Sequence, residues 1–195
     1  MQKVILILAL LGSIASKAQT VKDSTGRIFL FSSLGLSLLS KGVNPFFTSS
    51  VQTATGVGCK ASPHSAVAVT LSFDSYGYKK SGTSYNLDGT LRGTALALFY
   101  TYTFGIKSWQ PYVKAGGGGI RLSVPTVAVN PGMTNIRNES ETLGLLLAEA
   151  GLQVRLHARY SLFFGTESRW IAKSSLLSDA SLRPVTVKIG LISSF

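Results

Sequence analysis

The chain has 195 residues, a formal net charge of +11 at pH 7 and a single cysteine. This length suits one domain with a core, and it is short for two domains. One cysteine excludes an internal disulfide, and the positive residues are spread along the chain rather than clustered, which gives no support to a nucleic-acid partner. The basic excess instead favours contact with an anionic surface.

The first twenty residues, "MQKVILILALLGSIASKAQT", have the three parts of a secretory signal peptide. Lys3 precedes the apolar run 4–11, and the small residue Ala18 follows it. That run is too short to cross a bilayer as a helix, and no later stretch has the length and apolarity to do so. We therefore predict a cleaved signal peptide at 1–18 and a mature domain at 19–195. The alternative is a buried helix or an uncleaved anchor.

From Ile28 onward the chain has the pattern of strands separated by turns, with no helical apolar period over three turns. About eight runs have the length of a strand. They cover residues 28–39, 51–61, 66–78, 91–104, 110–122, 142–156, 160–172 and 183–195. Each is near the roughly 10 residues that a tilted transmembrane strand needs, and longer than the roughly 5–6 of a globular strand.

The connections between these runs alternate in length. The short ones are "SPHS", "GIKSW" and "HAR", and the long ones are "SKGVNPFFTSS", "KKSGTSYNLDGT", "SVPTVAVNPGMTNIRNESE" and "KSSLLSDASL". Short turns at one end and longer loops at the other are typical of an up-and-down outer-membrane barrel. A β-sandwich with Greek-key crossings would not keep this rhythm.

Apolar and polar residues alternate within the runs. In the run 142–156, the even positions Leu146, Ala148, Ala150, Leu152, Val154 and Leu156 are apolar, whereas the odd ones include Glu149, Gly151, Gln153 and Arg155. In the run 91–104, the large Leu96, Leu98, Tyr100, Tyr102 and Phe104 alternate with the small Gly93, Ala95, Ala97, Thr101 and Thr103. We predict that the large apolar side chains face lipid and the others a narrow lumen, the reverse of a soluble lipocalin-type barrel.

Aromatic residues gather toward the ends of the runs. They are Tyr76, Tyr100, Tyr102, Phe104, Trp109, Tyr112, Tyr160 and Trp170. Such a distribution predicts a pair of girdles at the two membrane interfaces. Ordinary core aromatics are the alternative, because aromatic residues favour strands in general.

The stretch "KAGGGGIRL" at 114–122 places four glycines in a row. A phosphate-binding loop needs its glycines between a strand and a helix, in a spacing that this stretch lacks. The following residues again have the pattern of a strand. We therefore expect a glycine-rich strand in which Lys114, Gly116 and Gly118 face the lumen and leave room for neighbouring side chains.

The same alternation collects charged residues of both signs on the inner face. These residues are Lys60, Asp74, Lys114, Glu149, Arg155, Glu167, Arg169 and Lys188. With about eight strands, a barrel interior is just wide enough to be filled by side chains. We predict a salt-bridged plug; the alternative is a small-ion path lined by a positive excess.

The sequence offers no set of residues with the spacing of a catalytic or metal site. The histidines, His64 and His157, lie in predicted short turns, away from any partner that would make a catalytic pair. Cys59 has lipid-facing parity, and no His/Cys/Asp cluster has ligand spacing. We expect no enzyme activity and no cofactor.

The order of these features resembles the OmpA-like, eight-stranded outer-membrane β-barrel proteins, in particular the small barrels of Bacteroidetes. The resemblance is carried by "GVGCKASPHSAVAVTLSF", "PYVKAGGGG", "AGLQVRLHARYSLFFGTESRW" and the last strand "VTVKIGLISSF". It implies an all-β, eight-stranded antiparallel barrel in a bacterial outer membrane. It also implies that the terminal Phe195 is the signal by which the barrel-assembly machinery recognises the chain.

Function is less specified than fold, because a fold hosts many functions. We expect a monomeric, non-catalytic membrane protein with a structural or loop-mediated role; a narrow porin-like pore, a soluble adhesin and a lipid-modifying enzyme are the alternatives. Basic residues in or beside the longer loops are expected to contact lipopolysaccharide phosphates. They are Lys41, Lys79, Lys80, Arg92, Arg121, Arg137 and Lys173.

Overall fold

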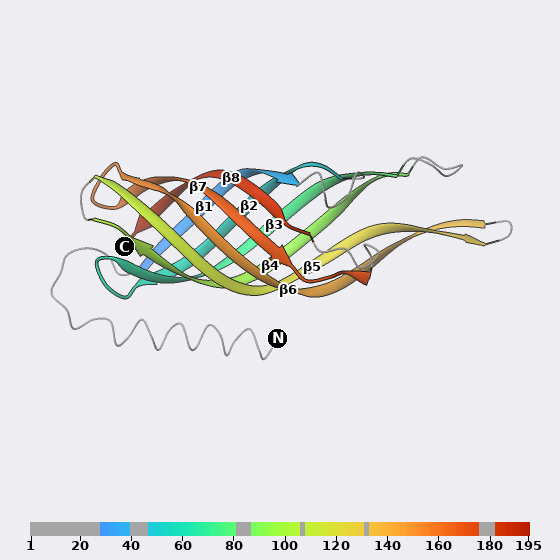
Figure 1. Cartoon of the computed structure of the whole chain (residues 1–195), viewed down its shortest axis with the longest axis horizontal. Helices are drawn as coiled ribbons and strands as arrows, with labels where there is room; N and C mark the ends of the chain where they lie inside the picture. The colour runs from blue at the N-terminus through green and yellow to red at the C-terminus, as the bar shows by residue number, and fades with distance from the viewer. Residues whose placement is uncertain (1–27, 40–46, 81–86, 106–107, 131–132, 176–181) are drawn as a thin grey trace.

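A computed structural model of the chain describes residues 28–39, 47–80, 87–105, 108–130, 133–175 and 182–195, so the signal peptide predicted at 1–18 lies outside it. The strands are β1 (Ile28–Leu39), β2 (Phe47–Lys60), β3 (Ser65–Lys80), β4 (Leu87–Thr103), β5 (Trp109–Asn130), β6 (Met133–Arg155), β7 (Tyr160–Ile171) and β8 (Pro184–Ser194). Each pairs antiparallel with the next, and β8 pairs with β1 to close a barrel (Figure 1). The predicted eight-stranded up-and-down barrel is confirmed. Within the described ranges, no helix has the length and apolarity needed to cross a membrane.

The two ends of the barrel differ. The connections from β2 to β3 and from β6 to β7 are short, and the chain's C-terminus lies at the same end (Figure 1). There the backbone N–H of Phe195 donates to the carbonyl of Ile28 at 2.9 Å, and that of Ser194 donates to the carbonyl of Arg159 at 2.8 Å. Short turns face the periplasm in outer-membrane barrels, so we call this the periplasmic end and the opposite one the outer end.

The outer surface of the barrel carries large apolar side chains. Leu98 on β4, Leu146 on β6 and Val187 on β8 are each more than half exposed. Neighbouring positions on the same strands point inward and are buried, as in the strict alternation along β4 and β7. A soluble domain does not expose apolar side chains all around its surface, whereas a bilayer requires it. The predicted lipid-facing side of the strands is confirmed.

The aromatic girdles need one correction. Tyr100, Tyr102, Phe104, Trp109 and Tyr160 are exposed around the periplasmic end, and Trp170 is exposed near the outer end of β7. Tyr76 and Tyr112, however, are only 0% and 5% exposed, because their parity turns them into the lumen. Assigning them to the girdle from their position near strand ends was wrong, since face is set by parity and not by nearness to a turn.

Within the stretch "SVPTVAVNPGMTNIRNESE", residues 123–130 and 133–141 are strand and not the predicted loop. β5 and β6 continue through it as a paired hairpin up to Asn130 opposite Met133, and the hairpin extends past the outer ends of β1 and β8 (Figure 1). The β-branched residues Val124, Thr126, Val127 and Val129 favour such an extension. The pairing of β5 with β4 ends at Ser123, two residues before Pro125. The missing N–H of Pro125 therefore costs no hydrogen bond to β4. β3 and β4 also pair beyond their predicted ends, up to Lys80 opposite Leu87.

Glycines in this barrel make room for the neighbouring strand and for aromatic rings. A Cβ added at Gly116 or Gly118 would overlap a carbonyl oxygen of β4, so the approach of β5 to β4 requires glycine there. On β2, Gly56 lies directly opposite Phe31, and an added Cβ would lie 2.5 Å from the Phe31 ring. Aromatic rings that cover strand glycines are a recurrent device of curved sheets.

Candidate functional site

Six of the eight predicted lumen charges form one continuous network in the middle of the barrel. Arg169 bonds Asp74 at 2.8 Å and Glu167 at 2.6 Å. Lys188 bonds Glu167 at 2.7 Å and Glu149 at 2.6 Å, and Glu149 also pairs with Lys114. Acid and base alternate along this chain of contacts, so three negative charges meet three positive ones.

The network crosses the lumen. β3 and β7 stand four strands apart in a closed ring of eight, on opposite walls, and the ion pair between Asp74 and Arg169 joins them. All six side chains are at most 8% exposed. Buried charges are tolerated only when they are paired and hydrogen-bonded, and the loss of one partner costs several kcal/mol. The network therefore links opposite walls of the barrel and fills the middle of its interior.

Three neutral side chains complete the network: Gln52 and Ser72, which the sequence analysis did not single out, and Tyr112, which it assigned to the girdle. Gln52 donates to Asp74 at 3.0 Å, and Arg169 donates to Ser72 at 3.1 Å. Tyr112 donates its hydroxyl proton to Glu149 at 2.5 Å. All three have the inward parity of their strands, so the same alternation that found the charges could have found them.

Between the network and the outer end, the lumen is filled by an apolar layer. Its members, each at most 3% exposed, are Tyr76, Leu91, Ile120, Leu122, Leu145, Leu147, Ile171 and Leu182. The sequence analysis expected small and polar residues on the inner face and missed this layer. The consecutive Leu145, Leu146 and Leu147 were a signal, because such a run turns apolar side chains to both faces of a strand: Leu146 to the outer surface, Leu145 and Leu147 into the lumen.

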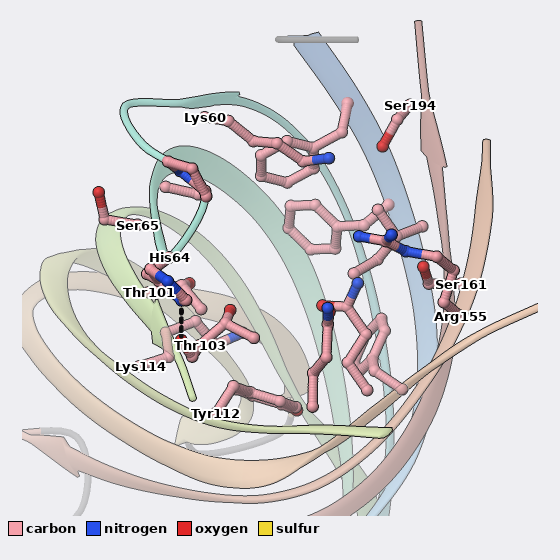
Figure 2. Close-up of a pocket in the computed structure, with 18 of the residues that line it drawn as sticks. Lys60, His64, Ser65, Thr101, Thr103, Tyr112, Lys114, Arg155, Ser161 and Ser194 are labelled. Atoms are coloured by element: carbon pink, nitrogen blue, oxygen red, sulfur yellow. Dashed lines mark hydrogen bonds between the residues drawn. The ribbon is translucent and has the colours of Figure 1, made fainter. Parts of the chain in front are cut away.

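Lys60 and Arg155 are placed differently from the other six charges. They line a cavity at the periplasmic end together with Lys114 and Glu149 (Figure 2). Among the described residues, neither Lys60 nor Arg155 makes an ion pair. The structure thus separates the predicted set into a balanced network and two additional cations.

The described members of the basic set predicted to contact lipopolysaccharide are spread over the outer half of the barrel. Lys41 lies outside the described residues, while Lys79, Lys80 and Arg137 are strand positions on β3 and β6. Arg92, Arg121 and Lys173 are exposed. Arg121 donates to Ser140 at 2.9 Å, and it pairs with Thr94, two residues from Arg92 on β4.

The histidines and the cysteine sit outside any catalytic arrangement in the described part of the chain. The Nδ1 of His64 lies 3.1 Å from the carbonyl oxygen of Thr103, the contact drawn as a dashed line in Figure 2. His157 is exposed in the turn before β7. Cys59 is a free thiol, half-buried on the outer face of β2. Across these described ranges, no group of three His, Cys, Asp or Glu side chains has the geometry to hold a metal ion.

Phe195 ends the chain beside the first strand. Its side chain is 66% exposed, and its backbone is tied to β1 by the hydrogen bond to Ile28. An exposed aromatic ring at the periplasmic rim is accessible to another protein. Its role as the assembly signal stays a prediction.

Comparisons with known proteins identify the fold. No protein-family model matches the chain, and no curated protein sequence is similar to it. Solved structures do match the chain. Neisserial surface protein A matches with a TM-score of 0.62 and 14% identity, over 86% of this chain and 97% of that one. The fold is that of the eight-stranded outer-membrane barrels.

Two further structures of this barrel type have the same extent. The outer membrane protein OprG from Pseudomonas aeruginosa matches with a TM-score of 0.54 and 11% identity, over 88% of this chain and 97% of that one. Ail, the attachment invasion locus protein of Yersinia pestis, solved in complex with the heparin analogue sucrose octasulfate, matches with a TM-score of 0.53 and 14% identity, over 86% and 98%. The barrel spans nearly the whole of each neighbour, and its lipid-facing belt places it in a bacterial outer membrane.

Proposed function

We propose that this barrel is a non-catalytic protein of the outer membrane that binds the phosphates of lipopolysaccharide with basic side chains at the outer rim of its apolar belt. The observation that carries the proposal is the position of Arg121. It faces outward and pairs directly with Thr94 on β4. Thr94 is the next outward-facing position after the exposed Leu96 in the direction of the outer end. Lipid contact therefore ends where this guanidinium begins.

Arg92 adds a second guanidinium at the same rim. It lies diagonally across from Arg121, since Arg92 pairs with Ser123 and Thr94 pairs with Arg121. Diagonal neighbours on one face of an antiparallel pair are about 7–8 Å apart, within reach of long side chains. Two guanidinium groups at this spacing suit a phosphate group, which arginine binds with paired hydrogen bonds. The exposed Lys173 just beyond β7 extends the basic rim.

The filled lumen favours this surface role over the porin-like alternative. The salt-bridged network joins opposite walls, and the apolar layer lies above it, so a hydrated ion would have to break both. Interiors of eight-stranded barrels are just wide enough for side chains. Single-channel recordings in planar bilayers should show no conductance steps. Steady channels would support the porin-like alternative instead.

The binding test compares a double variant of the rim and a control variant with the parent protein, each folded and detergent-solubilised. Arg92→Gln/Arg121→Gln should weaken binding of labelled lipopolysaccharide about 10-fold, because two charge-assisted hydrogen bonds to phosphate are lost. Arg159→Gln removes the same charge as Arg121→Gln from an exposed turn at the periplasmic end, and it should leave binding unchanged. Equal affinity of the double variant and the parent protein would refute the proposal. Sucrose octasulfate, the ligand of Ail, is a second polyanion against which lipopolysaccharide selectivity can be measured.

A further inference from the structure

A cavity of about 100 Å³ opens at the periplasmic end of the lumen (Figure 2). Its walls come from the inner faces of the strands and from the turn between β2 and β3. The network closes its inner end, where Lys114 and Glu149 meet. Arg155 is exposed and Lys60 half-buried, so the mouth is accessible from the periplasm.

The charge of the cavity is unbalanced. Its lining includes the cations Lys60, Lys114 and Arg155 and a single carboxylate, that of Glu149. Glu149 already forms ion pairs with Lys114 and Lys188, so it does not neutralise Lys60 or Arg155. Figure 2 shows the charged ends of Lys60 and Arg155 pointing into the same space. Two cations that share a partly desolvated space repel each other, and an anion between them removes that cost.

The wall behind the two cations is aromatic. Phe29, Phe31, Phe99 and Phe163 line it. The rings of Phe31 and Phe99 pack edge to face with centroids 5.7 Å apart, and the Nζ of Lys114 lies 4.3 Å from the centroid of Phe99. The rings are fixed by these contacts and by the glycines that they cover, so the wall is preformed. A preformed apolar wall with a few converging polar groups is the usual build of a small-ligand site.

Polar groups beside the aromatic wall complete the site. Gln110, Gln153, Ser161 and Ser194 line the cavity and supply amide and hydroxyl donors. The volume limits the occupant, because about 100 Å³ is less than the roughly 150 Å³ of an apolar cavity that holds one benzene ring. A small ring or a short aliphatic body therefore lies partly inside the cavity and extends to its mouth, where the charged end is placed.

We propose that this cavity binds a small organic anion with an apolar body, such as an aromatic or short aliphatic carboxylate, from the periplasmic side. Lys60 and Arg155 hold the carboxylate, and the phenylalanine rings contact the body. This site is separate from the outer rim of Arg92 and Arg121 and faces the opposite compartment. The barrel would thus carry one anion site at each membrane surface, for ligands of different size.

The test uses the folded barrel in detergent micelles, with benzoate as the probe and NMR shifts of the side-chain amides of Gln110 and Gln153 as the readout. Benzoate should give saturable shifts with a Kd on the order of 1 mM. Inorganic phosphate, which lacks the apolar body, and benzylammonium, which has the opposite charge, should each bind at least about 10-fold more weakly. Lys60→Gln/Arg155→Gln should weaken benzoate binding about 10-fold or more.

The matched control is Arg159→Gln/Arg183→Gln, which removes two positive charges from exposed side chains outside the cavity and should keep the benzoate Kd. Heat-dependent gel mobility verifies that each variant is folded, and Lys60→Gln alone provides the comparison if the double variant does not fold. The proposal is overturned if benzoate shifts neither amide up to about 10 mM. It is equally overturned if the charge-removing variant binds benzoate as the parent does, or if phosphate binds as tightly as benzoate.

Discussion

The outer and the periplasmic halves of the lumen are filled in different ways. The outer half holds the apolar layer around Leu91 and Leu122, and the buried network below it balances each charge with an opposite one. The periplasmic half holds a cavity with aromatic walls and two cations, Lys60 and Arg155, that lack an acidic partner in the described chain. Both halves use inward-facing residues of the same strands. The difference shows that parity assigns a residue to the lumen, whereas its level along the barrel decides whether its charge is compensated.

The largest effect is expected from breaking the network that separates the two halves. Arg169→Met leaves the carboxylates of Asp74 and Glu167 buried without their shared cation, and it should lower the free energy of unfolding by about 3–5 kcal/mol. Urea unfolding in lipid vesicles, followed by tryptophan fluorescence, measures it. Lys173→Met is the control, since it makes the same replacement at an exposed site. Equal stability of the two variants would mean that the network does not brace the barrel.

A smaller loss is expected in the apolar layer. Leu122 is 0% exposed, so Leu122→Ala should leave a cavity and cost roughly 3 kcal/mol of unfolding free energy. Leu98→Ala removes the same atoms from a side chain 55% exposed on the lipid face, where lipid chains fill the gap, and should cost less. The same urea titration compares them. A cost at Leu98 equal to that at Leu122 would show that the outer half of the lumen is loosely packed.

Much of the barrel follows from period two in the sequence. Strand number, lipid-facing side and the separation of short from long connections were all contained in the alternation around residues such as Leu96 and Glu149. The extension of β5 and β6 to Asn130 and Met133 was not, because turn-forming residues and Pro125 make that stretch look like a loop. The strand propensity of the β-branched residues in the stretch outweighs those local preferences.

The partners inside the lumen could not be read from the sequence. Asp74 and Arg169 are 95 residues apart, and they meet only because the tilt of the closed barrel brings β3 and β7 to the same level. Alternation therefore placed Lys60 and Arg155 in the same set as Glu149 without showing that they lie at the mouth. The aromatic wall shows the same limit, since the pairing of Phe31 with Gly56 depends on the register of β1 against β2.

The boundary between the two halves is sensitive to space as well as to charge. Tyr112 lines the cavity and donates to Glu149 of the network, and its hydroxyl would overlap a Cβ added at Gly165. Gly165→Ala should therefore displace Tyr112 and cost about 1–3 kcal/mol of unfolding free energy. Gly144→Ala is the control, because nothing lies within 4 Å of its added Cβ, and its change should stay within about 0.5 kcal/mol.

A double-mutant cycle shows whether this cost passes through the tyrosine hydroxyl. Tyr112→Phe removes the hydroxyl that an alanine at position 165 would strike, so the two changes together should cost less than the sum of their separate costs. The coupling should be about 0.5–3 kcal/mol, the range for residues in direct contact. Additive costs would place the strain of Gly165→Ala on the carboxylate of Glu149 instead, whose Oε1 lies 2.9 Å from the added Cβ. The hydroxyl of Tyr112 would then not be the contact through which the cavity and the network are coupled.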